Sequence, residues 1–295
     1  MEPNNFHPAN LAFIPEFTHQ PCWYCRKEKL YLQKYVQKNA YMKILISCAK
    51  TMAPEVSSGV PRITEPQYLD NAMELAGKMA AYSVEELMDI LKVSPAIASE
   101  NCIRYRNIIN GEAEMMPSLF AYTGMVFKHI APKQFSMEEL EYAHSHLRIT
   151  SFLYGLLKPL DAISPYRLEG SVHICRESGK TVFSYWREIL TDSFIAEIKA
   201  DGGILVNLAS GEMKDLFDWK KVEKEVKVIQ PEFMIQGKDG KPKTVTVYAK
   251  QCRGEMTRCI IQDRMDSPEQ LTTFEWDGFR YSPSLSSDTK YVFIK

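Results

Sequence analysis

Short apolar runs typical of buried strands alternate with helix-forming stretches from Met42 to the end of the 295-residue chain. The runs KILIS (43–47) and ILVNLAS (204–210) have the length and apolar character of buried strands. VKVIQPEFMI and TVTVYAK flank GKDGKPK and predict a β-hairpin over 226–250, and KYVFI predicts a last strand. This alternation predicts an α/β or α+β fold, with a mixed sheet and surrounding helices.

Helix-start signals place helices between these strands. Ser83 and Ser136 each stand three residues before a glutamate, which is the capping-box pattern, and Pro95 follows Ser94 as in a first helical turn. Pro159 cannot continue a helix, so we expect the helix that begins after Ser136 to end before it. Together with apolar periodicity, these signals predict helices over 68–81, 84–91, 95–109, 117–130, 137–157, 181–200 and 251–265.

Residues 1–41 differ in composition from the rest of the chain. They are rich in Pro, Asn, His and Gln, and then become Lys-rich with aromatics and helical in character over 25–40. Met42 opens the first predicted strand, so we interpret 1–41 as an N-terminal extension, or a mis-called start, outside a domain of residues 42–295. Cys22 and Cys25 form a CxxC, but the spacing to His7 and His19 matches no standard zinc pattern. We interpret the pair as ordinary thiols and predict no metal site.

Charge and composition limit the classes of partner. The net charge is −1, so any binding of anions must come from a local patch and not from the total. No run approaches the roughly 18 apolar residues of a membrane helix, and the first residues lack a signal-peptide pattern. Seven scattered cysteines fit a reducing compartment. We therefore expect a cytoplasmic protein without a membrane partner, with a monomer as the default.

Polar and basic residues follow three of the predicted strands. ILIS runs into Lys50 and Thr51, ILVNLAS contains Asn207, and TVTVYAK ends at Lys250 with Arg253 beyond it. Ligands bind at the carboxyl ends of strands in open α/β sheets, so the sequence predicts an anion site at this edge. The alternative is that strand ends simply meet solvent. SxxKT at 47–51 lacks the glycines of a phosphate loop, which argues against a Walker-type nucleotide site.

The segment 83–108 has the layout of a helix–hairpin–helix. In that motif, the amides at the start of the second helix meet a DNA phosphate, and Lys92 and Arg104 supply nearby positive charge. The turn holds Val93, Ser94 and Pro95 where such motifs usually have glycines. An ordinary helical hairpin packed on the core is therefore the alternative.

Charges are threaded closely through apolar side chains in HLRITSFLYGLLKPLDAISPYRLEG (146–170). We interpret the run as a cleft wall, in which leucines hold the wall rigid and Gly155 allows a ligand or a backbone to come close. The alternative is that Arg167–Glu169 and Lys158–Asp161 are ion pairs that brace a loop. The predicted anion-binding residues of the chain are Lys50, Thr51, Lys92, Arg104, Arg148, Lys158, Arg167, Asn207, Lys250, Arg253 and Arg258.

Four blocks of sequence, in this order and spacing, resemble the YaaA peroxide-stress protein family over residues 42–295. They are ILISCAKT (44–51), residues 146–170, LVNLASGE (205–212) and YAKQCRGEMTRCIIQDR (248–264). The resemblance implies an unusual α/β fold, a bacterial cytoplasmic protein and a role in surviving hydrogen peroxide by keeping unincorporated iron low. It also implies DNA binding through a positively charged cleft with a helix–hairpin–helix. It brings no established reaction and no cofactor.

Three positions depart from the family pattern. Cys48 stands where proline is usual, Met213 where an aromatic is usual, and Phe152 where glycine is usual. None of these changes removes a basic residue, so with the resemblance we expect a non-enzymatic DNA-binding protein of the peroxide response. An enzyme on a phosphate-bearing molecule, with Glu169 or Tyr154 as acid or base, is the alternative. The sequence shows no ferritin-like or iron–sulfur spacing, so an effect on iron is expected to be indirect.

Overall fold

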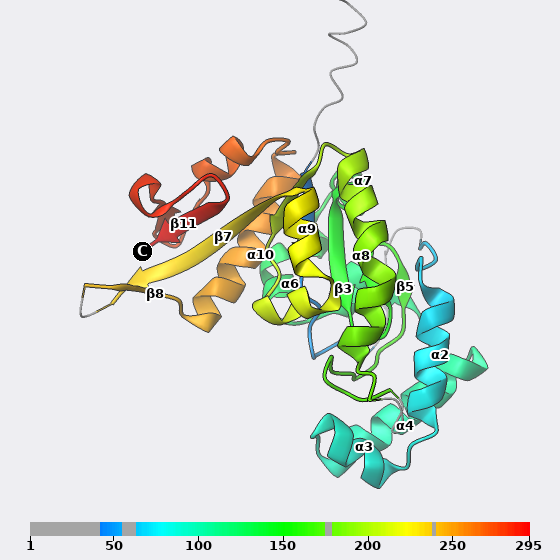
Figure 1. Ribbon diagram of the computed structural model, residues 1–295. Helices are drawn as coiled ribbons and strands as arrows, with labels where there is room; N and C mark the ends of the chain where they lie inside the picture. Colours follow the sequence, from blue (N-terminus) through cyan, green and yellow to red (C-terminus); the bar gives the residue numbers. More distant parts are fainter. Residues whose placement is uncertain (1–41, 55–62, 175–178, 238–239) are drawn as a thin grey trace, which may run out of the picture. The chain divides into compact units, whose positions relative to one another are not determined.

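A nine-stranded mixed sheet is the centre of the computed structural model, which describes residues 42–54, 63–174, 179–237 and 240–295 (Figure 1). Its strand order is β4-β3-β1-β6-β7-β11-β10-β9, and β8 pairs with β7. Parallel pairs join β3, β1, β6, β7 and β11, and antiparallel pairs add the remaining strands. The predicted mixed α/β fold is therefore confirmed. The CxxC and the predicted helix over 25–40 lie outside the described residues.

The strands have the following bounds. The large sheet contains β1 (Met42–Ile46), β3 (Leu147–Ser151), β4 (Gly155–Leu157), β6 (Ile204–Asn207), β7 (Lys227–Gln236), β8 (Pro242–Lys243), β9 (Glu275–Trp276), β10 (Phe279–Tyr281) and β11 (Lys290–Ile294). A separate pair consists of β2 (Met116–Pro117) and β5 (Ala162–Ile163).

Helices cover both faces of the sheet, as buried parallel strands require. In Figure 1, α8 (Val182–Ala200) and α9 (Trp219–Glu225) lie in front of the sheet, and α6 (Met125–Ile130) and α10 (Thr246–Gln262) lie behind it. The other helices are α2 (Leu69–Ala80), α3 (Val84–Leu91), α4 (Pro95–Asn110), α5 (Ser118–Ala121) and α7 (Met137–His146). Short 3₁₀ turns are η1 (Pro132–Gln134), η2 (Gly211–Leu216), η3 (Pro268–Thr273) and η4 (Pro283–Leu285).

The helix-start signals are confirmed where the sequence made them strong. Ser83 and Ser136 each accept the amide of a glutamate three residues on, and that glutamate accepts the serine amide. Ser94 caps α4, in which Pro95 is the first residue. The helices α2, α3, α4 and α8 lie where they were predicted, while the predicted helix over 117–130 is two short helices, α5 and α6.

The prediction of one helix over 137–157 is wrong. The helix α7 ends at His146, and the chain continues as β3 and β4. All five residues of β3 are buried, and β3 pairs in parallel with β1. Three of these buried residues, Arg148, Thr150 and Ser151, are polar, so the pattern of apolar and polar residues in β3 does not show which residues are buried and does not distinguish the strand from a helix. Gly155, at φ +74°, faces the ring of Trp186, whose Cζ3 would lie 2.7 Å from an added Cβ.

The prediction of a strand at TVTVYAK is also wrong. After the short strand β8, the chain enters α10 at Thr246, so the alternation of 244–248 does not extend β7 as a long hairpin. The buried residues of α10 recur at helical spacing, among them Ala249, Cys252, Met256 and Ile260. This spacing overrides the β-propensity of the first turn. Lys250 and Arg253 therefore project from a helix and not from a strand end.

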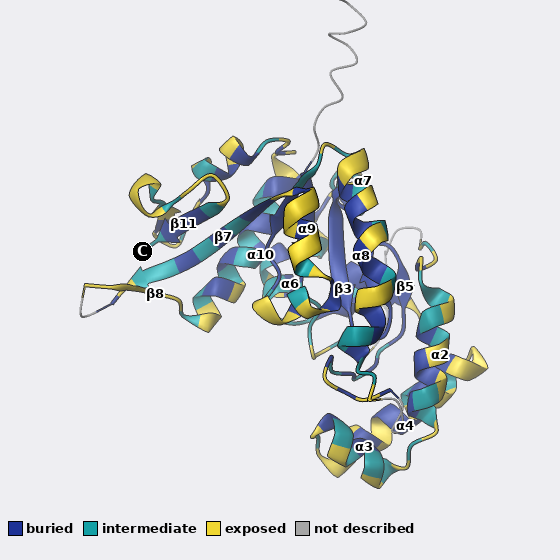
Figure 2. Ribbon diagram, in the orientation of Figure 1, coloured by how far each residue is buried: buried dark blue, intermediate teal, exposed yellow. Residues whose placement is uncertain are grey.

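The helices α2, α3 and α4 pack on one another, α4 against both of the others. Figure 2 shows their mixed burial, and Leu87, Leu91 and Tyr105 are among their buried residues. Lys92, at φ 53°, ends α3 in the left-handed conformation, and three residues separate α3 from α4. Among the described residues, no helix combines the length and apolar character needed to cross a membrane.

Candidate functional site

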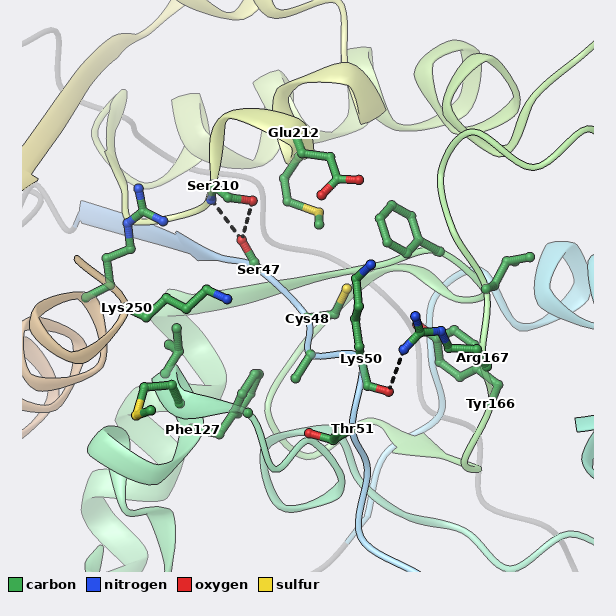
Figure 3. Close-up of a pocket in the computed structure, with 18 residues that line it drawn as sticks. Ser47, Cys48, Lys50, Thr51, Phe127, Tyr166, Arg167, Ser210, Glu212 and Lys250 are labelled. Carbon is green, nitrogen blue, oxygen red and sulfur yellow. Dashed lines mark hydrogen bonds between the residues drawn. The ribbon is translucent and has the colours of Figure 1, made fainter. Parts of the chain in front are cut away.

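A cavity of about 300 Å³ opens at the carboxyl-terminal edge of three adjacent parallel strands (Figure 3). Residues that follow β3, β1 and β6 in the chain line it, and α6, α10 and the loop at 166–168 complete the walls. This is the position at which open α/β sheets bind ligands, because several loops leave the sheet there. The lining residues are Ser47, Cys48, Ala49, Lys50, Thr51, Gly124, Met125, Val126, Phe127, Phe152, Tyr166, Arg167, Leu168, Ser210, Glu212, Met213, Lys250 and Arg253.

One end of the cavity carries two cations that share a carboxylate. Lys50 Nζ lies 3.1 Å and Arg167 Nη2 lies 2.7 Å from Oε1 of Glu169. Arg167 also donates to the Lys50 carbonyl at 3.3 Å, and the dashed line in Figure 3 marks this bond. Glu169 therefore neutralises part of the charge at this end. The ion pair of Arg167 and Glu169, which the sequence left open, is present.

The other end carries Lys250 and Arg253, one turn apart on α10. Neither side chain has an ion pair or a side-chain hydrogen bond within the described residues, and Arg253 Nε is buried without a hydrogen-bond partner. Burial lowers the pKa of the Arg253 guanidinium. A cation held away from water without an anion is unfavourable, so this end of the cavity favours a negatively charged ligand.

Two serines lie on the same side of Figure 3 as Lys250 and join the ends of β1 and β6. Ser47 Oγ donates to Ser210 Oγ at 3.2 Å, and the Ser210 amide donates to Ser47 Oγ at 2.8 Å. Asn207 holds the turn before Ser210, because its Oδ1 accepts the Ala209 amide at 3.1 Å and its Nδ2 donates to Gln230 at 2.8 Å. Asn207 is fully buried and therefore positions this turn without facing the cavity.

Cys48 lies on the cavity wall between the two ends. Its amide donates to Thr150 Oγ1 at 3.3 Å. Burial, opposed by the Thr150 hydrogen bond and reinforced by the charges of Glu212 and Glu169, raises the pKa of the thiol to about 12. The thiolate is the nucleophilic form of cysteine, so a thiol held neutral is a poor nucleophile.

A chain of buried hydroxyls supports the cavity from behind. The Tyr166 hydroxyl lies 2.7 Å from Ser151 Oγ and 3.0 Å from the Tyr122 hydroxyl. The Tyr105 hydroxyl donates to the carbonyl oxygen of Arg167 and so ties α4 to the loop that carries this cation. Burial raises the pKa of Tyr105, Tyr122 and Tyr166, so all three remain neutral donors.

Two of the predicted anion-binding residues lie in a different place. Arg148 is buried in β3 and forms an ion pair with Glu197 of α8, which Lys43 also approaches to 3.4 Å. Lys158 lines a much smaller cavity beside Arg148 and Asp161. Asp161 accepts the Lys158 amide at 2.7 Å, so a backbone contact joins this pair. Arg148 thus serves the contact between the sheet and α8.

The remaining predicted residues are also outside the cavity. Lys92 and Arg104 belong to the α3–α4 hairpin, where Arg104 pairs with Glu100 at 2.6 Å. Arg258 lies beyond Arg253 on α10 and donates to Gln134 and Gln262 at 2.7 and 3.0 Å. The structure thus brings together Lys50, Thr51, Arg167, Lys250 and Arg253, with Glu169 in contact with two of them.

Tyr154, one of the two acid–base candidates, is 1% exposed, and its hydroxyl accepts the Ser164 amide at 3.1 Å. It does not line the cavity. Sequence reasoning missed Glu212 and the wall formed by Gly124 to Phe127. Glu212 could have been predicted from the sequence, because it lies two residues after Ser210 in the block LVNLASGE. The wall was not, because only tertiary packing brings α6 to the strand ends.

The fold and cavity agree with the comparison to known families. A model of the family described as peroxide stress protein YaaA matches residues 42–285. The chain belongs to this family. Among similar proteins, a UPF0246 protein of Bacteroides fragilis is 54% identical over 252 residues, which are 85% of this chain and 98% of that protein.

More distant relatives align over the same part of the chain. A UPF0246 protein of Parabacteroides distasonis is 40% identical over 254 residues, covering 86% of this chain and 100% of its own length. A UPF0246 protein of Crocosphaera subtropica is 34% identical over 258 residues, which cover 86% of this chain and 100% of that protein. The peroxide-stress family is thus established for the domain that contains the cavity.

Proposed function

We propose that the protein acts in the peroxide stress response by binding DNA phosphates at this cavity and its rim. The observation that carries the proposal is the pair Lys250 and Arg253, which lack an anionic partner among the described residues. Lys250 is exposed, whereas Arg253 is half-buried, and an unpaired, partly desolvated cation such as Arg253 regains favourable electrostatic energy when an anion binds. Because phosphate contacts dominate the affinity of proteins for DNA, the phosphate backbone is the ligand that this chemistry favours.

The α3–α4 hairpin is proposed as a second contact with the DNA backbone. Ser94 caps α4, a helix of 16 residues, and Lys92 ends α3 immediately before it. The first amides of a helix attract phosphate because they are unpaired and the helix dipole is positive there. Such contacts position DNA and carry no sequence information, so we expect little preference for base sequence.

Keeping unincorporated iron low, which the family resemblance implies, is part of the proposal. Within the described ranges, no group of three or more His, Cys, Asp or Glu side chains is arranged to hold a metal ion. DNA binding is proposed as the direct activity, and the iron effect is measured separately. Spin resonance of whole cells gives the pool of loose iron in strains that carry either the wild type or a variant without DNA affinity.

Fluorescence anisotropy with labelled duplex and single-stranded DNA tests the proposal across a salt series. We expect saturable binding whose log affinity falls linearly with log salt. Changing Lys250 and Arg253 together to alanine should flatten the slope by about 1.8, since each duplex phosphate contact contributes about 0.9. The matched control changes Lys199 and Lys221 to alanine, which removes the same charge from α8 and α9.

Two results would contradict the proposal. One is the absence of saturable binding at low salt, and the other is an equal loss of affinity in the control variant. Circular dichroism and thermal melting of each variant show that the fold is retained, so that a loss of binding reports on the cavity.

An enzyme that acts on a phosphate-bearing molecule is the second candidate. Glu212 lines the cavity, and Glu169 contacts Lys50 and Arg167 at one end of it, so two carboxylates lie in or beside the cavity. Carboxylates so placed are suited to acid–base work next to a bound phosphate. Phosphate release from a panel of phosphate esters tests this idea. Turnover that Glu169→Gln abolishes, while the Lys199 and Lys221 control keeps it, would favour the enzyme over the binding protein.

A further inference from the structure

The two ends of the cavity differ in how far their charge is neutralised. Lys50 and Arg167 share Glu169, so that end has a resident anion. Lys250 and Arg253 have none among the described residues. In Figure 3, Lys250 reaches in from the α10 side, and Lys50 and Arg167 stand on the opposite side. An incoming anion is therefore attracted more strongly to Lys250 and Arg253 than to Lys50 and Arg167.

Two hydroxyl groups that line the cavity, those of Ser47 and Ser210, lie near the same end, whereas Thr51 and Tyr166 lie on the side of Lys50 and Arg167 (Figure 3). Ser47 and Ser210 bond to each other, and each hydroxyl has a further capacity to donate or accept. Two cations and two hydroxyls match a group with three terminal oxygens and a double negative charge. Glu212 also lines the cavity, and its carboxylate repels an anion from the side on which it lies.

The size of the cavity restricts what can enter. At about 300 Å³ it is at the lower limit of ligand pockets, which span roughly 300–1,000 Å³, and the strand ends close its floor. An internal phosphodiester continues as chain on both sides and can touch only the rim. A phosphate monoester ends the chain and can enter with its three free oxygens first.

We infer that the Lys250–Arg253 end of the cavity binds a phosphate monoester, which DNA presents at a phosphorylated strand end, more tightly than an internal phosphodiester. This inference rests on the proposed function and narrows its ligand. A monoester carries about −1.5 to −2 charges at pH 7, because its second pKa is about 6, whereas each internal phosphate carries one charge. Two unneutralised cations therefore distinguish these groups by charge as well as by shape.

The test compares single-stranded oligonucleotides of one sequence that carry either a 5′-phosphate or a 5′-hydroxyl, each labelled at the other end. Anisotropy with the full chain should show the phosphorylated strand binding roughly tenfold more tightly or better, because hydrogen bonds between charged groups are the strong ones. Arg253→Gln should remove this preference. Arg280→Gln, an exposed arginine of β10 that pairs with Glu275, is the matched control and should keep it.

The pH dependence separates charge recognition from simple steric fit. The preference for the 5′-phosphate should shrink as the pH falls from about 7.5 to 5.5, since the monoester loses its second charge near pH 6. Deoxyadenosine monophosphate, added as a competitor beside deoxyadenosine, distinguishes a free nucleotide from a strand end. Competition as strong as that of the phosphorylated strand would identify the nucleotide as the ligand and would keep the monoester inference.

The failures of the two proposals are distinguishable. Saturable, salt-dependent binding of both strands with equal affinity would overturn the monoester inference and leave DNA binding intact. A preference that persists in Arg253→Gln would also overturn it. If neither strand binds but the monophosphate does, the result refutes the proposal of DNA binding and supports the monoester site. If nothing binds, both fall.

Discussion

Gly254 is the residue through which α10 contacts the wall of the cavity, and its replacement by alanine is a sensitive test of this packing. An added Cβ would lie 2.4 Å from the carbonyl oxygen of Val126 and 2.6 Å from Cβ of His129, both on α6. The carbonyl belongs to the helix backbone and cannot turn aside as a flexible side chain would. Gly254→Ala must therefore push α6 and α10 apart.

Two opposing effects decide the magnitude. Glycine inside a helix is about 0.5–1 kcal/mol less favourable than alanine, so the substitution gains that amount. Overpacking costs typically about 1–3 kcal/mol, and contact with backbone places this case in the upper half of the range. We expect a net loss of about 1–2.5 kcal/mol, which at about 3 °C per kcal/mol corresponds to a fall of about 3–8 °C in melting temperature for a domain of this size.

Gly77 provides the matched control. It lies inside α2, and an added Cβ there would meet nothing within 4 Å. Gly77→Ala should therefore keep the gain in helix propensity and stabilise the protein by about 0.5–1 kcal/mol. The same chemical change is thus expected to have opposite signs at the two sites, as measured by urea unfolding and thermal melting.

DNA affinity provides a second measurement on the same variants. Gly254→Ala moves the wall from Gly124 to Phe127 without removing a cation, so affinity should fall while the slope against salt stays the same. A variant that is as stable as the wild type and binds DNA equally well would refute the argument that this contact sets the cavity.

Three further predictions follow from buried groups. Arg148→Met should lower the free energy of unfolding, measured by urea denaturation, by about 2–4 kcal/mol. The loss is smaller than that expected from breaking a fully buried ion pair, because the Glu197 side chain is 27% exposed. Burial of Glu197 raises the pKa of its carboxyl, but Arg148 lowers it by more, so the pKa lies below the ordinary value of 4.5. The ion pair therefore stabilises the fold above pH 4.5, and this stability is lost as the pH falls further. The difference in unfolding free energy between wild type and Arg148→Met should accordingly become smaller at low pH. Cys48, with a pKa of about 12, should resist alkylation at pH 8 until the protein unfolds, as mass spectrometry would show. Tyr105→Phe should lower the free energy of unfolding by about 1–3 kcal/mol, as urea unfolding would measure, because the Arg167 carbonyl then loses the Tyr105 hydroxyl as its donor.

Local signals in the sequence predicted where α3, α4 and α7 begin. A capping box such as that of Ser83 or Ser136 is completed within four residues, so its outcome depends little on the rest of the chain. The strands β1 and β6 were also predictable, because a short apolar run between loops has few alternatives in an α/β protein. The strand ends that carry Lys50 and Ser210 followed from them.

The remaining parts depended on long-range contacts. Leu147 to Ser151 became a strand because it pairs with β1, about 100 residues earlier in the chain. The sequence predicted Arg148 as an anion-binding residue of the cleft. Its partner in the structure is Glu197, 49 residues later in the chain, and no local pattern predicts that pair. A buried, charged residue on a strand can face a helix or a ligand, and the sequence alone does not distinguish the two.

The segment TVTVYAK enters helix α10, although its sequence predicted a strand, and this determines how Lys250 and Arg253 are placed in the cavity. A strand would have sent Lys250 and Arg253 to opposite faces of the sheet, because side chains alternate along a strand. On α10 they are three residues apart and lie on adjacent turns of one face. Gly254, the next residue, lets α6 come close enough to form the facing wall. One turn of helix therefore both presents the cations and sets the width of the space in front of them, so a change at Gly254 and a change at Arg253 should act on the same ligand by different means.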